Sequence, residues 1–183
     1  MSRKILGFVA LAIVGGLMTG MVSDAIAGHE IIGAPKCIMC HKAKTGDQAG
    51  IWSGSKHAGA FATLGTDAAK KIAADKGLGD PQTEAACLKC HTTHGFLGSD
   101  VVVNAAGKYE DAEGVGCEAC HGAGSDYKSK KVMEDAAAAK AAGLVMDKSE
   151  EFCTKCHNEE SPTFKGFVLA EKWEAIKHPA PEK

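Results

Sequence analysis

Residues 114–124 read Gly-Val-Gly-Cys-Glu-Ala-Cys-His-Gly-Ala-Gly, and the rest of the chain is organised around this stretch. At its centre, Cys117-Glu-Ala-Cys120-His121 fits the C-x-x-C-H signature of covalent c-type haem attachment. Two cysteines three residues apart lie on one helical turn, so both thiols can reach the vinyl groups of one porphyrin. The following histidine is then held where its imidazole can bind the iron from the proximal side. The flanking glycines have no side chain to collide with a porphyrin plane, so backbone or a second haem could approach closely.

The same signature occurs three more times, and the eight cysteines of the 183-residue chain all belong to the four motifs. Two Cys₄ zinc sites or thioredoxin-like centres are the alternatives, but neither requires a histidine after each second cysteine. We therefore expect four covalently bound haem c groups. The thioether cysteines would be Cys37, Cys40, Cys87, Cys90, Cys117, Cys120, Cys153 and Cys156, and the proximal iron ligands His41, His91, His121 and His157.

The N-terminus has the pattern of a secretory signal peptide. Two basic residues precede an uncharged apolar run over 5–22, and Ala25-Ile-Ala27 forms an A-x-A cleavage site. A retained anchor is the alternative, since the run is near the lower limit for a membrane span. The cleavage site and the glycines within the run favour removal. We expect a signal peptide over 1–27 and a tetrahaem cytochrome c domain over 28–183, exported to the periplasm or cell exterior without a membrane span after cleavage.

Composition narrows the fold and the partners. The formal net charge is −2 and no basic face or motif is present, which argues against nucleic-acid binding. Only 5% of residues are aromatic, which is low for a core made of protein alone. Apolar porphyrin faces would supply the missing buried surface. We expect a small haem-cored protein, mainly α with long loops and little or no β-sheet, that is largely unfolded without haem.

Periodicity places the regular elements. Apolar spacing and capping residues predict helices over 51–64, 67–75, 130–142 and 169–177. Val101-Val-Val103 predicts a brief strand. The sequence Gly33-Ala-Pro35 predicts an extended entry to the first haem motif.

Four histidines remain outside the motifs, as many as there are open iron positions: His57, His178, His94 and His29. We therefore expect bis-histidine ligation at all four haems, with methionine as the competing distal ligand. His57 is the best placed, on an amphipathic helix face. His29 would be the second residue of the mature protein, where chains normally fray, so a fixed role there needs a partner in its own subunit or the next.

Three stretches resemble the cytochrome c-554 type of tetrahaem cytochrome, which carries electrons from hydroxylamine oxidoreductase. They are Ile51-Trp-Ser with Lys56-His57-Ala, residues 114–124, and Ser161-Pro162, in the family's order over most of the mature chain. The resemblance implies a mostly helical fold with closely packed, partly stacked haem pairs. It also implies that His57 ligates the third haem and that His178 corresponds to the ligand of the fourth.

The sequence departs from the family at two places. The family has a ligand histidine a few residues beyond its third motif, but residues 125–131 contain none. The family's second haem is five-coordinate, whereas His94 stands three residues after His91 here. The distal ligands of the first two haems must therefore be reassigned, with His29 and His94 as the available pair.

The motifs predict electron transfer as the function, between closely packed haems in an exported redox chain, and not an enzyme. Its partners would be redox proteins, either other cytochromes or a quinol- or oxidoreductase-linked donor. One alternative is a subunit of a polymeric extracellular cytochrome filament, in which His29 ligates a haem of the next subunit. Another is a haem enzyme that acts on a small nitrogen or sulfur compound at a five-coordinate haem, with His94 as proton donor.

Overall fold

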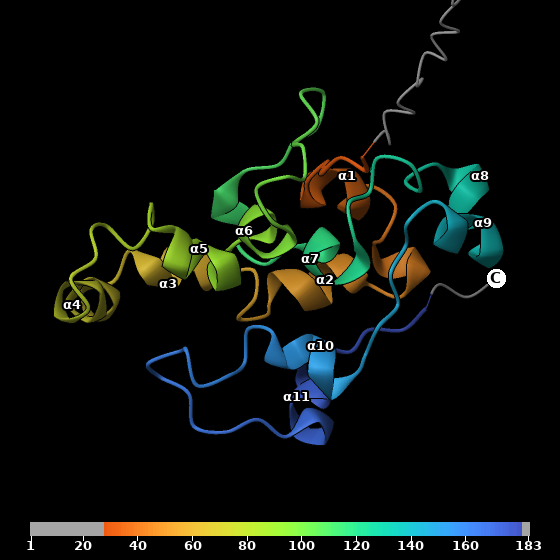
Figure 1. Cartoon of the computed structure of the whole chain (residues 1–183). Helices are drawn as coiled ribbons and strands as arrows, with labels where there is room; N and C mark the ends of the chain where they lie inside the picture. The colour runs from red at the N-terminus through yellow and green to blue at the C-terminus, as the bar shows by residue number, and fades with distance from the viewer. Residues whose placement is uncertain (1–27, 181–183) are drawn as a thin grey trace, which may run out of the picture.

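The computed structural model describes residues 28–180, so the expected signal peptide over 1–27 lies outside the described residues. Within them the chain forms short helices joined by long loops, and no sheet (Figure 1). The α-helices are α1 (Ala34–Ile38), α2 (Gln48–Ser53), α3 (Ala60–Leu64), α4 (Asp67–Asp75), α5 (Ala85–His91), α6 (Thr93–Leu97), α7 (Cys117–His121), α8 (Lys130–Met133), α9 (Ala136–Ala141), α10 (Glu150–Thr154) and α11 (Leu169–Ile176), and the 3-10 helices are η1 (Ala43–Thr45) and η2 (Asp111–Glu113). The prediction of a mainly α, loop-rich fold is confirmed.

Helix α4 has the predicted bounds. The Thr66 side chain accepts a hydrogen bond from the backbone N–H of Ala69 and so satisfies one of the free donors of the first turn. Helix α11 ends one residue before the predicted end. None of the helices within residues 28–180 is long and apolar enough to cross a membrane.

Two predicted helices are each broken in two. The predicted helix over 51–64 is wrong, because α2 ends at Ser53, before Gly54, and α3 begins after Gly59, with turns between them. Glycine lowers the helical stability of this intervening stretch. The predicted helix over 130–142 is also broken, because the Asp135 carboxylate accepts hydrogen bonds from the N–H groups of Ala137 and Ala138 and starts α9 afresh.

The extended entry predicted for Gly33-Ala-Pro35 is wrong, since α1 begins at Ala34 with proline in its first turn. Residues 29–34 lead into this helix and end on its first residue, and we call them the lead segment. Ile31 forms a parallel bridge with Val103, with Ile31 N–H donating to Val102 O at 2.9 Å. The predicted strand over Val101-Val-Val103 is thus reduced to this one bridge.

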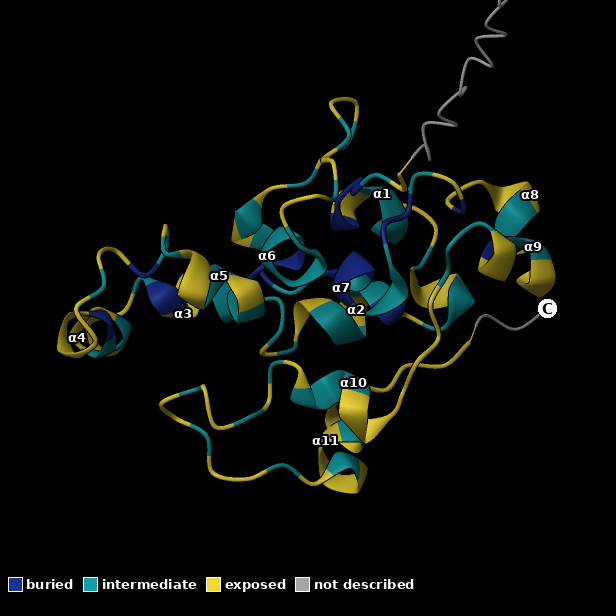
Figure 2. Ribbon diagram, in the orientation of Figure 1, coloured by how far each residue is buried: buried dark blue, intermediate teal, exposed yellow. Residues whose placement is uncertain are grey.

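The buried protein is concentrated around the lead segment and α7 (Figure 2). Ile31 and Ile32 are 0% and 1% exposed, and Ala119 of α7 is 3% exposed. Residues 144–180, which we call the C-terminal arm, contain α10 and α11 and have no buried residue. The protein core therefore lies mainly in residues 31–34 and 118–127, with Leu64, Ala73 and Ala139 buried elsewhere, and not in the arm.

Candidate haem-attachment sites

Each C-x-x-C-H motif forms a turn of helix. The second motif forms the C-terminal end of α5, and the third motif is the whole of α7. The first and fourth continue past α1 and α10 by one turn, in which His41 N–H donates to Cys37 O and His157 N–H to Cys153 O, both at 3.1 Å. The two thiols and the histidine of each motif thus lie along one turn, as covalent attachment to one porphyrin requires.

Two proximal histidines are oriented by backbone carbonyls. His91 Nδ1 lies 2.7 Å from Ala60 O, and His121 Nδ1 lies 2.9 Å from Val145 O. A carbonyl oxygen only accepts, so Nδ1 carries the proton in both rings and Nε2 is free to bind a metal. Burial lowers the pKa of His121, and the nearby His178 and His41 lower it further. The neutral imidazole that iron binds is thus the favoured form.

Two further histidines face proximal ones. The ring centroids of His57 and His157 are 6.1 Å apart, and those of His121 and His178 are 5.8 Å apart. Two metal–nitrogen bonds of about 2 Å each, together with the ring radii, span roughly 6 Å. The spacing of both pairs therefore fits one iron held between two imidazoles.

These pairs place each histidine beside a different motif from the one that the resemblance implies for it. His57 lies against the proximal histidine of the fourth motif, and His178 against that of the third. The ring of His157 also stacks on Phe167 at 5.1 Å. Sequence order alone could not give this pairing, because each pair joins residues more than 50 positions apart.

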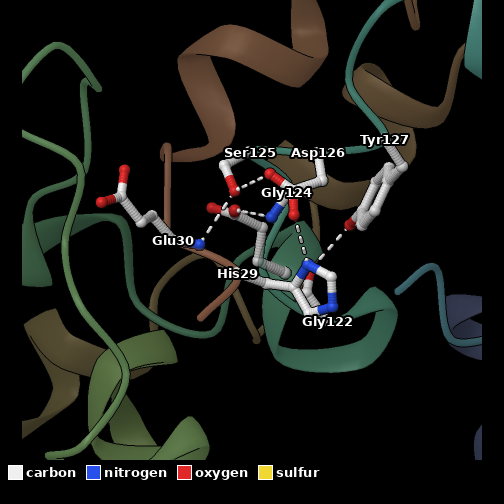
Figure 3. A network of polar contacts seen from close by, with 8 residues as sticks. His29, Glu30, Gly122, Gly124, Ser125, Asp126 and Tyr127 are labelled. Atoms are coloured by element: carbon white, nitrogen blue, oxygen red, sulfur yellow. Dashed lines mark hydrogen bonds and ion pairs between the residues drawn. The ribbon is translucent and has the colours of Figure 1, made fainter. Parts of the chain in front are cut away.

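His94 and His29 have other neighbours. The rings of His94 and Tyr109 meet edge to face, with their centroids 6.4 Å apart. The backbone N–H of His94 donates to the Tyr109 hydroxyl, which donates in turn to Asp111 Oδ1 at 2.6 Å. His29 Nδ1 lies 2.8 Å from Asp126 Oδ2, and its ring points toward that carboxylate (Figure 3). The ring contacts among residues 28–180 pair neither histidine with a proximal one.

Thiols from different motifs lie close together. Cys37 and Cys117 perturb each other, since the Cys117 thiol raises the pKa of Cys37 and the Cys37 thiol lowers that of Cys117. Cys156 Sγ lies 4.0 Å from Lys89 O, inside the second motif, and its pKa is raised by burial and by Cys90. The first motif therefore adjoins the third, and the second adjoins the fourth.

An open cavity of 390 Å³ lies where the second and third motifs approach each other. Both Cys90 and Cys120 line it, together with Phe96 and Phe152, whose rings meet edge to face at 5.7 Å. Thiols and aromatic walls line this cavity, and the imidazoles of His91 and His121 directly follow its two cysteines in the chain, so the residues fit haem. Zinc fits less well, because within residues 28–180 no three His, Cys, Asp or Glu side chains are arranged to hold a metal ion.

The glycines around the third motif adjoin protein. A Cβ at Gly114, where φ is +71°, would lie 2.5 Å from His57 O, and a Cβ at Gly122 would lie 2.8 Å from Gly143 O. The expectation that protein backbone approaches these glycines closely is thus confirmed.

Two of the stretches that carry the family resemblance form one packed unit. The Val115 N–H donates to His57 O at 3.0 Å, and the Trp52 indole Nε1 donates to Val115 O at 2.9 Å. The segment before the third motif thereby fixes the backbone that presents His57.

Chains that carry several C-x-x-C-H turns facing shared cavities are multihaem c-type cytochromes, and this chain is one of that class. The family model described as "Cytochrome c554 and c-prime" matches residues 36–122. Cytochrome c-554 of Nitrosomonas europaea is 32% identical over 175 residues, covering 87% of this chain and 70% of that relative. The chain belongs to the cytochrome c-554 family and is a multihaem electron-transfer cytochrome that carries covalently bound haem c. No solved structure matches it significantly.

Proposed function

We propose that this protein is an exported tetrahaem electron carrier whose haems are mostly bis-histidine ligated. Each haem is bound through the two cysteines and proximal histidine of one motif. Haem c supplies one-electron oxidation and reduction at its iron. The observation that carries the proposal is the spacing of the two histidine pairs, His57 with His157 and His178 with His121.

The chain's contribution is to hold the ligands rigidly. The carbonyls of Ala60 and Val145 fix two proximal rings, and the Val115 peptide fixes the backbone of His57. Ligands that do not move between oxidation states keep the reorganisation that accompanies electron transfer small. The approach of the first motif to the third, and of the second to the fourth, supports passage of electrons between neighbouring haems to a redox partner protein.

The haem count and ligation can be measured directly. A pyridine haemochrome assay should give four haems per chain, and the mass of the exported protein should correspond to a start at Gly28. His57→Ala and His178→Ala should each convert about one haem in four from low spin to high spin. Lys56→Ala, at the exposed residue next to His57, is the matched control and should leave every haem low-spin. Fully low-spin spectra in both test variants would contradict the proposed pairing.

The distal ligands of the first and second haems are assigned to His29 and His94 only by elimination. Carbon monoxide distinguishes this assignment from an open iron. The reduced protein should bind none if both haems are six-coordinate. Binding at one haem would instead favour the enzymatic alternative, with His94, Tyr109 and Asp111 as the nearby polar groups.

His29 supports a second candidate function, a filament subunit. Its side chain is 45% exposed and lines an open cavity of 330 Å³ with Val101 and Val102. The Asp126 carboxylate holds Nδ1, as carboxylates commonly do for metal-binding histidines. Electron microscopy of secreted material should reveal filaments, and His29→Ala should abolish them and leave one haem high-spin. A monomeric variant with every haem low-spin would contradict ligation across subunits.

A further inference from the structure

Glu118, inside the third haem motif, is a buried carboxylate enclosed by backbone donors. Its side chain is 1% exposed. Oε1 accepts from the N–H groups of Ile32 at 3.0 Å and Gly124 at 2.6 Å, and Oε2 accepts from Ile32 at 3.1 Å and Gly33 at 2.7 Å. Both oxygens only accept hydrogen bonds, as an ionised carboxylate does.

These bonds join two haem-attachment helices. Ile32 and Gly33 directly precede α1, which carries Cys37, whereas Glu118 itself lies on α7. Glu113 extends the contact, since both of its carboxylate oxygens lie within 3.2 Å of the Ala34 N–H. Three successive backbone N–H groups of the lead segment therefore donate to two carboxylates, Glu113 and Glu118, which lie five residues apart. The placement of the first motif against the third thus depends on polar contacts of Glu118 as well as on apolar packing.

The position requires a carboxylate of this length. A glutamine amide would present an NH₂ donor to at least one backbone N–H, leaving buried donors unpaired. Aspartate would keep the charge but draw the oxygens back by one methylene. Ionised carboxylates are rarely buried without full hydrogen bonding, because desolvation of the charge is costly.

We propose that Glu118 is a positioning residue for electron transfer, which fixes the first haem-attachment helix against the third and places a buried negative charge beside both. The inference rests on the proposed tetrahaem function. A negative charge in a medium of low dielectric constant favours the more positive, oxidised form of a nearby iron. Glu118 should therefore lower the reduction potentials of the two haems attached by these helices.

The test is a redox titration of the full haem-loaded protein carrying Glu118→Gln, followed by visible absorption and EPR. Two of the four reduction potentials should shift upward, and the other two should stay within error of wild type. Glu118→Asp, which keeps the charge, should bring both shifted potentials back toward wild type. Four unchanged potentials in Glu118→Gln would overturn the proposal.

Glu151→Gln is the matched control for loss of a charge near a haem motif. Glu151 lies two residues before Cys153 on α10, but its side chain is exposed. Water and salt screen it, so its removal should shift the potentials much less. An equal shift in Glu151→Gln would show that burial and position do not matter, which contradicts the proposal.

A variant that fails to assemble does not leave the proposal untested. Gly124→Ala should displace the same carboxylate without changing Glu118 itself, because the added Cβ would lie 3.0 Å from Glu118 Oε1. If Glu118→Gln does not accumulate with four haems, Glu118→Asp and Gly124→Ala should still change the EPR signals of the same two haems. Wild-type EPR signals in both would overturn the positioning role.

Failure of the proposed function gives a different result. A wild-type protein that contains fewer than four haems, or haems that cannot be reduced reversibly, contradicts the tetrahaem carrier before any variant is compared. Four reversible haems in wild type with unchanged potentials in Glu118→Gln contradict only the role of Glu118.

Discussion

The lead segment and the C-terminal arm are held in opposite ways. The lead segment is closed on several sides by protein: Ile31 pairs with Val102, Ile32 O accepts from Lys108 N–H, and Glu118 binds the backbone of Ile32. The C-terminal arm has no buried residue, and its helices α10 and α11 leave most of their side chains exposed or half-buried. The first region is stabilised mainly by the polypeptide itself, whereas the second meets the rest of the chain through its histidine pairs and a few surface contacts, such as Phe152 with Phe96 and Glu160 with Lys89.

The difference teaches which part of this cytochrome needs its cofactor in order to fold. Buried apolar area supplies most of the favourable free energy of folding. Residues 144–180 bury too little of their own surface to offset the entropy of ordering them. His157 and His178 lie in this arm and face His57 and His121 outside it, so iron ligation would attach the arm to the rest of the chain.

The largest expected effect is loss of the fourth haem through Cys153→Ala combined with Cys156→Ala. Without the fourth porphyrin and its ligands, residues 150–168 should exchange amide hydrogens nearly as fast as an unfolded chain, while residues 29–34 stay protected. Hydrogen exchange followed by mass spectrometry measures both regions in one experiment. Lys155→Ala, within the same motif, is the control and should leave both protected. Retained protection of residues 150–168 in the double variant would show that this part of the arm folds without the fourth haem.

The next effect concerns the glycine that supports His57. Gly114→Ala combines strain at φ +71° with a Cβ only 2.5 Å from His57 O, so it should lower the free energy of unfolding by about 3 kcal/mol. Gly77→Ala is a matched control, because its φ is +70° but nothing lies within 4 Å of the added Cβ. It should cost about 1 kcal/mol. Denaturant unfolding of the two variants measures the difference, and equal losses would mean that the contact with His57 O is unimportant.

The covalent chemistry of this site could be predicted from sequence because it is local. Cysteine and histidine within five residues on one helical turn specify attachment regardless of the remaining chain, and α4 follows equally from its own capping and periodicity. The pairing of distal histidines could not be predicted, since it depends on where loops bring residues such as His57 and His157 together.

The residues missed from sequence are the two carboxylates that bind the lead segment. Glu118 and Glu113 read as ordinary charged residues, because nothing in their spacing shows that backbone N–H groups will enclose them. The broken helices had a clearer signal, since Gly54, Gly59 and the capping residue Asp135 stand at the breaks. The partner that a fixed His29 requires is Asp126 of the same chain, and the Ser125 hydroxyl accepts from the N–H of the next residue, Glu30.

A smaller effect should appear as a pH dependence of the free energy of unfolding, caused by Glu113, which binds the lead segment. Burial, together with the negative charge of the nearby Glu118, raises the pKa of Glu113 from 4.5 to about 7 against the opposing hydrogen bond from the Ala34 N–H. The folded state then binds this proton more tightly than the unfolded state. Stability should therefore be highest below about pH 4.5 and fall as the pH rises toward 7. The loss is at most about 3 kcal/mol, reduced by the partial exposure of the group.

Glu113→Gln should remove that slope. Urea unfolding of the haem-loaded protein at several pH values between 4.5 and 7.5 measures it. Glu159→Gln, which removes an exposed carboxylate in the C-terminal arm, should keep the wild-type slope. A Glu113→Gln protein that still loses stability over this range would assign the effect to another group.

The smallest expected effect comes from removing a single helix cap in the C-terminal arm. The Ser149 side chain accepts from the Phe152 N–H at 3.1 Å and starts α10 in the arm. Ser149→Ala should lower local stability by about 1 kcal/mol, which makes exchange of α10 about five-fold faster. Thr66→Ala removes the corresponding cap of α4 and should act on α4 alone. If Ser149→Ala also accelerates exchange of residues 29–34 five-fold, the arm and the lead segment open together, and the contrast between them does not hold.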